Sequence, residues 1–219
     1  MTEIEQQIIS NTRDFVKERL KGAEGGHDWF HVERVYNTAR TIASREKGNQ
    51  FIIEIGALLH DIADAKFHQG DETIGPRIAR SFLETQQMSA GDITHVENII
   101  IWISFKGGNE RQDFFSRELD IVQDADRLDA MGAIGIARTF NYGGFKGRLL
   151  YDPAIPPVPD MDKETYRTSE GPTINHFYEK LLLLKDRMNT STGKRMAEER
   201  HRFMELFLRQ FYREWSGES

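Results

Sequence analysis

The segment 51–64 constrains the fold of this chain most, because its sequence, FIIEIGALLHDIAD, is apolar on nearly every helical face. A helix that is apolar all round must be covered by neighbouring helices, so this segment is predicted to be the central helix of a bundle. It also contains His60 and Asp61. An unpaired carboxylate in such surroundings costs several kcal/mol, so a buried aspartate needs a cation or hydrogen-bond donors.

The same helical period runs through most of the chain. In the segment 29–47, apolar residues recur at i, i+3, i+7 and i+10 and form one stripe of an amphipathic helix: Val32, Val35, Ala39 and Ile42. Strand patterns are nearly absent. The sequence therefore predicts an all-α protein, with further helices at 3–20, 72–87, 91–105, 117–141, 173–189 and 192–215.

The interval 143–172 is different, because it holds five of the six prolines of the chain. Gly143 and Gly144 at its start are expected to end the helix at 117–141. A regular helix is not expected after them, and the interval is either a lid over a binding site or a passive surface loop.

Composition excludes several classes of protein. The absence of cysteine removes disulfides, zinc ribbons, cysteine nucleophiles and iron–sulfur clusters, so any metal must be held by His, Asp or Glu. A net charge of −6 provides no basic face for duplex nucleic acid. The chain has no apolar run of the ~18 residues that a membrane span needs, and its first residues do not form a signal peptide. We therefore expect a cytoplasmic protein that binds neither membranes nor duplex nucleic acid.

Histidines and aspartates stand in three of the expected helices, and they are candidate metal ligands. His31 lies in 29–47, His60 and Asp61 lie in 51–64, and Asp124 and Asp126 lie in 117–141. Two imidazoles and two carboxylates would suit a divalent ion with positions left open for water and substrate. The alternative is that the histidines are satisfied core residues and the aspartates are helix caps, and spacing alone leaves both interpretations open.

The order of these residues resembles that of the HD-domain metal-dependent phosphohydrolase superfamily. The likeness covers roughly residues 27–140 and rests on the motifs HVERV, ALLHD and ADRLDA. Longer stretches, including GHDWFHVERV and QDADRLDAMGAIGIARTF, are similar to small bacterial HD proteins of the YedJ and YpgQ type over nearly the whole chain. This resemblance implies one HD domain over 1–219, with the metal-site core at 27–140, the loop at 143–172 and C-terminal helices at 173–215.

The resemblance also implies a ligand set. The family pattern assigns the metal ligands to His31, His60, Asp61 and Asp126, with Asp124 as an alternative ligand or as an acceptor for a ligating histidine. A single divalent ion is expected, because no His-His pair lies between the HD doublet and the late aspartate. Mn²⁺ is the first choice, and Mg²⁺, Co²⁺, Ni²⁺, Fe²⁺ and Zn²⁺ are alternatives.

Other polar residues near these motifs suggest a phosphate site. Asp64 lies one helical turn beyond the HD doublet, where it is predicted to act as general base or acid, or else to pair with a lysine. Lys66 and Arg127 are expected to neutralise phosphate oxygens, and His27 and His68 to contact the substrate. Each of these four residues, considered alone, is also explained as a solvent-exposed or structural side chain without a role in binding.

The function implied by the resemblance is a hydrolase that attacks phosphorus with a metal-activated water. For this group of HD proteins it implies cleavage of an NTP or dNTP into a monophosphate and pyrophosphate. Alternatives are a nucleotidase or phosphodiesterase of the same class, a nucleotide or metal sensor without turnover, and an adaptor with a structural metal. The expected partner is a small phosphorylated molecule, and a homodimer is left open.

Overall fold

The computed structural model describes residues 1–22, 28–63, 71, 73–103, 112–158 and 171–218. All secondary structure in this part of the chain is helical, which confirms the predicted all-α class. The chain divides into two compact units, 1–126 and 127–219, which we describe separately. None of the described helices has the length and apolar character needed to cross a membrane. The expectation of a single domain over 1–219 stays a prediction.

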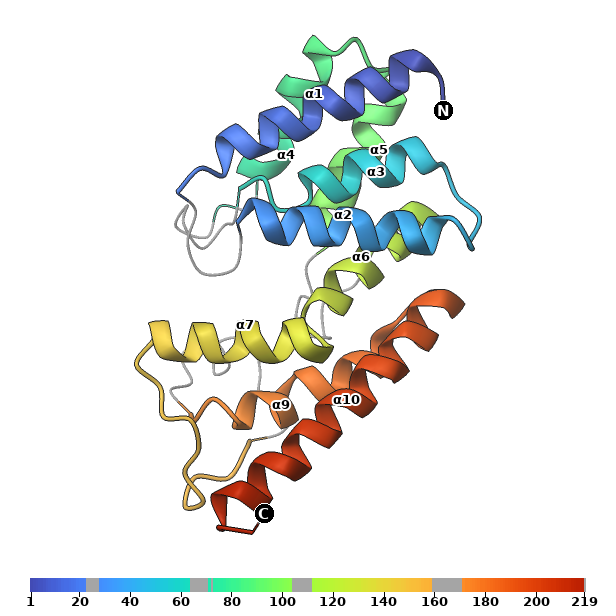
Figure 1. The fold of residues 1–219 in the computed structure, drawn as a ribbon. Coiled ribbons are helices and arrows are strands. Elements are labelled where there is room, and N and C mark those ends of the chain that lie inside the picture. The colour runs from blue at the N-terminus through green and yellow to red at the C-terminus, as the bar shows by residue number, and fades with distance from the viewer. Residues whose placement is uncertain (23–27, 64–70, 72, 104–111, 159–170, 219) are drawn as a thin grey trace. The chain divides into compact units, whose positions relative to one another are not determined.

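The first unit is built around α3, whose residues from Phe51 to Leu59 are all buried. This confirms the predicted central helix, and α3 packs against α1, α2 and α5. The helices of this unit, including α6, which crosses into the second unit, are α1 (Glu3–Arg19), α2 (Trp29–Ala43), α3 (Gln50–Leu59), α4 (Ile74–Thr85), α5 (Ala90–Trp102) and α6 (Arg117–Asp129) (Figure 1).

The helix α3 ends at Leu59, earlier than the residue 64 predicted for it. His60 occupies the C-cap, and its ring Nδ1 lies 2.8 Å from the carbonyl oxygen of Ala57 in the last turn of the helix. A side-chain donor on one of the last carbonyls helps to terminate a helix. Ile62 N then bonds the carbonyl of Leu59 at 3.2 Å, so the chain turns here and Asp61 lies outside the helix.

The second unit begins in the last turn of α6 and contains α7 (Gly132–Phe145), α9 (Asn175–Glu179), the 3₁₀ helix η2 (Leu181–Arg187) and α10 (Ser191–Trp215) (Figure 1). The single helix predicted at 117–141 was wrong, because Gly132 has φ +68° and separates α6 from α7. The helix predicted at 173–189 is instead α9 and η2, separated at Lys180.

Gly143 and Gly144 do not end α7, which continues to Phe145, so the loop predicted to start at 143 begins later. Gly143 lies where α7 touches Thr173: a Cβ on Gly143 would stand 2.3 Å from Thr173 Oγ1. The glycine therefore serves a close approach between two segments rather than a helix end.

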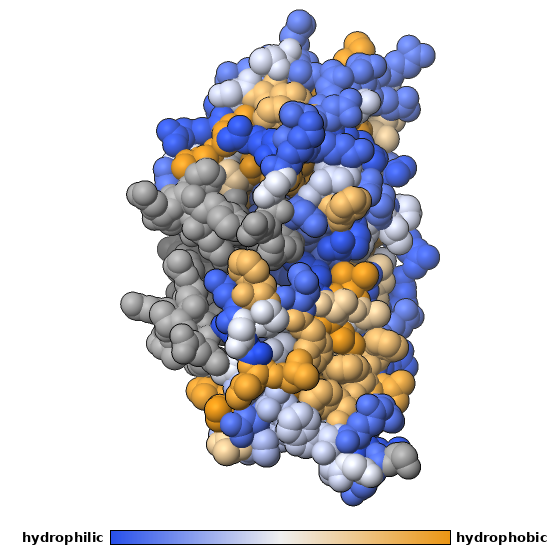
Figure 2. Space-filling view, turned by 60° about the vertical axis from the view of Figure 1, so that its left-hand side comes forward, coloured by the Kyte–Doolittle hydropathy of each residue, from blue (hydrophilic) through white to orange (hydrophobic). Residues whose placement is uncertain are grey.

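Aromatic rings fill the interior of the second unit. The rings of Phe140, Phe177 and Phe207 lie with centroids 5.8 to 6.2 Å apart. The same unit also exposes apolar side chains, among them Phe145 and Leu149, and Figure 2 shows a broad hydrophobic area over it. Such surfaces are typical of protein–protein contacts, and the homodimer that the sequence left open stays an open prediction.

Candidate metal centre

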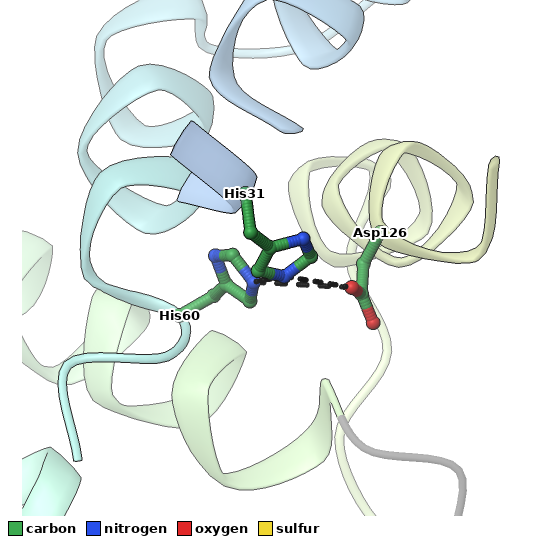
Figure 3. Close-up of side chains that lie close together, drawn as sticks. All are labelled: His31, His60 and Asp126. Atoms are coloured by element: carbon green, nitrogen blue, oxygen red, sulfur yellow. Dashed lines mark hydrogen bonds and ion pairs between the residues drawn. The ribbon is translucent and has the colours of Figure 1, made fainter. Parts of the chain in front are cut away.

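Side chains from three helices meet in the first unit. His31 extends from the start of α2, His60 from the end of α3 and Asp126 from the last turn of α6 (Figure 3). The two Nε2 atoms of the histidines are 3.2 Å apart. Asp126 Oδ1 lies 3.5 Å from His31 Nε2 and 3.9 Å from His60 Nε2. One donor atom from each residue thus lies within 4.8 Å of the other two.

The hairpin of α2 and α3 brings the two imidazoles together. The helices run in opposite directions, so the first turn of α2 lies beside the end of α3. Asp28 caps α2, and its Oδ1 accepts a hydrogen bond of 2.9 Å from the backbone N–H of His31. His31 and His60 are both buried. The local cap and the hairpin together fix both histidine backbones at one place.

Hydrogen bonding and burial set the chemical form of His60. Its Nδ1 donates to the carbonyl oxygen of Ala57, which leaves the lone pair of Nε2 directed at the cluster. Burial lowers the pKa of His60 below its usual 6.5, Asp126 opposes that shift, and the neighbouring His31 adds to it. The ring is therefore neutral at pH 7, which is the form that binds metals.

The cluster fits a divalent metal ion. Two nitrogens bound at about 2.1 Å to one ion, with an angle of about 100° between the bonds, lie about 3.2 Å apart. The histidine nitrogens have this separation. A mixed set of imidazole nitrogen and carboxylate oxygen suits ions such as Mn²⁺, Fe²⁺, Co²⁺, Ni²⁺ and Zn²⁺.

The other residues singled out in the sequence have different positions. Asp61 lies beside the cluster, with Oδ2 3.9 Å from His31 Nε2. Asp124 is fully buried on α6 and is not part of the group of three. Arg127 is the first residue of the second unit and donates from Nη1 to the carbonyl of Arg187 in the same unit at 2.5 Å. The remaining predicted residues, His27, Asp64, Lys66 and His68, lie outside the described part of the chain.

One buried network near the cluster was missed in the sequence. Glu54 is 1% exposed, and its carboxylate accepts hydrogen bonds from Tyr36 Oη at 2.6 Å and Gln50 Nε2 at 2.8 Å. Arg40 Nε lies 3.4 Å from the same carboxylate. The signal that could have revealed it is the acidic residue within the run FIIEIGALL, because a charge in an apolar helix needs partners.

Comparison with known proteins identifies the family of this chain. Residues 29–131 match the sequence model of the HD domain. The chain is 37% identical over 220 residues to YpgQ of Bacillus subtilis (strain 168), covering 99% of this chain and 97% of that protein. The crystal structure of an HD-superfamily hydrolase from Bacillus thuringiensis is 46% identical, covers 97% of this chain and 98% of its own, and has a TM-score of 0.77.

The crystal structure of Bacillus subtilis YpgQ in complex with ADP is 35% identical, covers 96% of each chain and has a TM-score of 0.76. The hydrolase among these structures supports a hydrolase class for the present chain. High coverage on both sides means that the likeness extends beyond the metal-site helices to the C-terminal helices. The chain belongs to the HD domain family.

Proposed function

We propose that this protein is a metal-dependent phosphohydrolase that cleaves nucleoside triphosphates or deoxynucleoside triphosphates to a monophosphate and pyrophosphate. The observation that carries the proposal is the cluster of His31, His60 and Asp126. The ADP bound to the related YpgQ supports a nucleotide as the substrate class. Mn²⁺ is the proposed ion, because a mixed N/O donor set accepts it readily.

In this proposal His31, His60 and Asp126 hold the ion, and Asp61 completes the set from beside the cluster. Bound there, a divalent ion supplies a Lewis acid for a phosphoryl oxygen and a water of lowered pKa. The carboxylates of Asp61 and Asp126 balance the charge of a divalent ion. Burial keeps the His60 ring neutral, and the hydrogen bond from Nδ1 to the Ala57 carbonyl fixes the tautomer that directs the Nε2 lone pair at the ion.

The exposed fractions of the side chains support an entry for substrate beside Asp126. The side chains of His31 and His60 are 3% exposed, whereas that of Asp126 is 35% exposed. Water and a phosphate chain can therefore approach from the side of α6. We assign Asp64 to hold or move the proton during attack, and Lys66, Arg127, His27 and His68 to contact the phosphates.

The test begins with protein stripped by a chelator and then loaded with Mn²⁺, Mg²⁺, Co²⁺, Ni²⁺ or Zn²⁺. Each form is incubated with nucleoside mono-, di- and triphosphates, cyclic nucleotides and a generic phosphodiester, and phosphate and pyrophosphate are measured separately. Pyrophosphate with a monophosphate, formed only with metal, is the expected result. Free phosphate alone would assign the site to a nucleotidase. Metal binding without any turnover would favour a sensor.

Variants separate the roles within the site. His60→Ala and Asp126→Asn are expected to weaken Mn²⁺ binding by about 100-fold or more and to abolish turnover. Asp64→Asn is expected to bind metal normally and to lose rate. His95→Gln is a matched control, because His95 contacts Ser116 and Glu118, away from the cluster. Full activity of a metal-free His60→Ala protein would contradict the proposal.

A further inference from the structure

The end of α6 is held by a residue far along the chain. Arg200, on α10, donates from Nη1 to the carbonyl oxygen of Leu128 across 72 residues of sequence. Leu128 lies in the last turn of α6, two residues beyond Asp126. The same carbonyl also accepts from the backbone N–H of Met131 at 3.0 Å, so Arg200 adds a second, charged donor at the negative end of the helix dipole.

The stem of Arg200 is fixed as well as its head group. A Cβ on Gly132 would stand 3.0 Å from Arg200 Cγ and 3.2 Å from Arg200 Cβ, so the stem lies directly on this glycine. Gly132 has φ +68°, a conformation that side chains rarely adopt. The break between α6 and α7 therefore depends on a glycine for two reasons, and the arginine fills the space that the glycine leaves.

A partly buried ion pair reinforces this junction. Asp129, the last residue of α6, is 4% exposed, and its Oδ2 lies 2.6 Å from Arg138 Nη1 on α7. Burial lowers the pKa of Arg200, and the charge of Asp129 opposes that shift. The last turn of α6 is thus bound through a backbone carbonyl by α10 and through a side chain by α7.

We infer that Arg200 is a positioning residue for the metal centre, which it serves by fixing the last turn of α6 and hence the carboxylate of Asp126. Helix ends fray, so a charged side-chain donor on a carbonyl of the last turn helps to hold that turn, and metal sites require donor distances to hold within about 0.2 Å. The inference rests on the proposed metal site. Arg200 lies outside residues 29–131, the part that matches the HD domain.

The test measures Mn²⁺ affinity of the full chain by electron paramagnetic resonance of free Mn²⁺, together with the melting temperature. Arg200→Met keeps the stem that packs on Gly132 and removes the donor, and we expect about 10-fold weaker Mn²⁺ binding. Arg200→Lys restores a charge without the planar head group, and we expect a partial rescue to about 3-fold weaker binding. If Arg200→Met does not fold, Arg200→Lys alone carries the test.

Arg80→Met is the matched control. Arg80 on α4 forms an ion pair with Glu97 on α5 in the first unit, away from α6. We expect it to lower the melting temperature and leave Mn²⁺ affinity unchanged. Wild-type affinity in both Arg200 variants, or an equal loss of affinity in Arg80→Met, would overturn the inference while leaving the metal site intact. Failure of the wild-type chain to bind Mn²⁺ would instead overturn the proposed function and the inference together.

Discussion

Glu54 provides a quantitative test of what holds the two histidine-bearing helices in register. Its buried carboxylate receives hydrogen bonds from Tyr36 on α2 and Gln50 on α3, and Arg40 lies beside it. Because α2 and α3 run in opposite directions, the pair Tyr36–Glu54 lies one and a half turns along the hairpin from the histidine pair. We expect this bond to fix the alignment that brings the imidazoles together.

The expected loss of free energy of unfolding depends on which hydrogen-bonding groups each substitution leaves without a partner. Glu54→Leu leaves the Tyr36 hydroxyl buried without its acceptor and is expected to lower the free energy of unfolding by about 3 kcal/mol. Tyr36→Phe leaves Glu54 with its other two partners, so it should cost about 1.5 kcal/mol. The double variant replaces both hydrogen-bonding groups by apolar groups and should lower the free energy of unfolding by about 2 kcal/mol. If the two single effects were additive, the loss would be roughly 4.5 kcal/mol.

Urea unfolding at pH 7 and 25 °C, followed by circular dichroism, measures the three variants against the wild type. A coupling of about 2.5 kcal/mol is the expected result. Additive losses in the double variant, or a Glu54→Leu protein as stable as the wild type within about 0.5 kcal/mol, would refute the reasoning. In the first case the bond between Tyr36 and Glu54 would contribute no energy to the hairpin.

Two further predictions concern the second unit. Gly143→Ala should lower the free energy of unfolding by about 2 kcal/mol, because its Cβ would meet Thr173 at 2.3 Å. Gly144→Ala meets nothing within 4 Å and should raise the free energy of unfolding by up to about 1 kcal/mol through helix propensity. Similar effects of the two substitutions would contradict the packing of Gly143 on Thr173. Burial, with Lys180 and Arg148 nearby, lowers the pKa of His176 to about 3. Below pH 6.5 the histidine is therefore protonated in the unfolded chain but not in the folded chain. The free energy of unfolding of the wild type should fall by about 2 kcal/mol from this cause between pH 7.5 and 5, and that of His176→Gln should fall by about 2 kcal/mol less. An unchanged pH slope in the variant would exclude this cause.

The sequence predicted the elements that follow from periodicity. The central α3 was recognisable because nothing but burial explains a helix that is apolar on all faces. The stripe of α2 was recognisable too, and Val32, Val35, Ala39 and Ile42 are fully buried. These signals depend on residues within one helix, so they can be read without knowing what packs against it.

The elements that were predicted wrongly depend on contacts made elsewhere in the chain or on single side chains. The end of α3 depends on the bond between the His60 ring and the Ala57 carbonyl, which apolar spacing does not report. The break at Gly132 accommodates the stem of Arg200, and the position of Gly143 inside α7 accommodates Thr173. In each glycine case the partner lies at least thirty residues later in the sequence.

The choice between Asp124 and Asp126 illustrates the same division at the candidate site. Two positions apart on a helix point about 200° from each other, so only one of these carboxylates can face the histidines. Periodicity left the choice open, because each residue shares a face with apolar neighbours. In the folded chain Asp124 is fully buried, whereas Asp126 lies with the histidines and is partly exposed. Asp126 both reaches the two imidazoles and contacts solvent, which suits a metal ion with open coordination positions. Hydrolysis requires such open positions, and a closed structural metal site does not have them. Measuring whether water exchanges on Mn²⁺ bound to this chain, by proton relaxation, therefore separates the enzyme from an adaptor with a structural metal before any substrate is known.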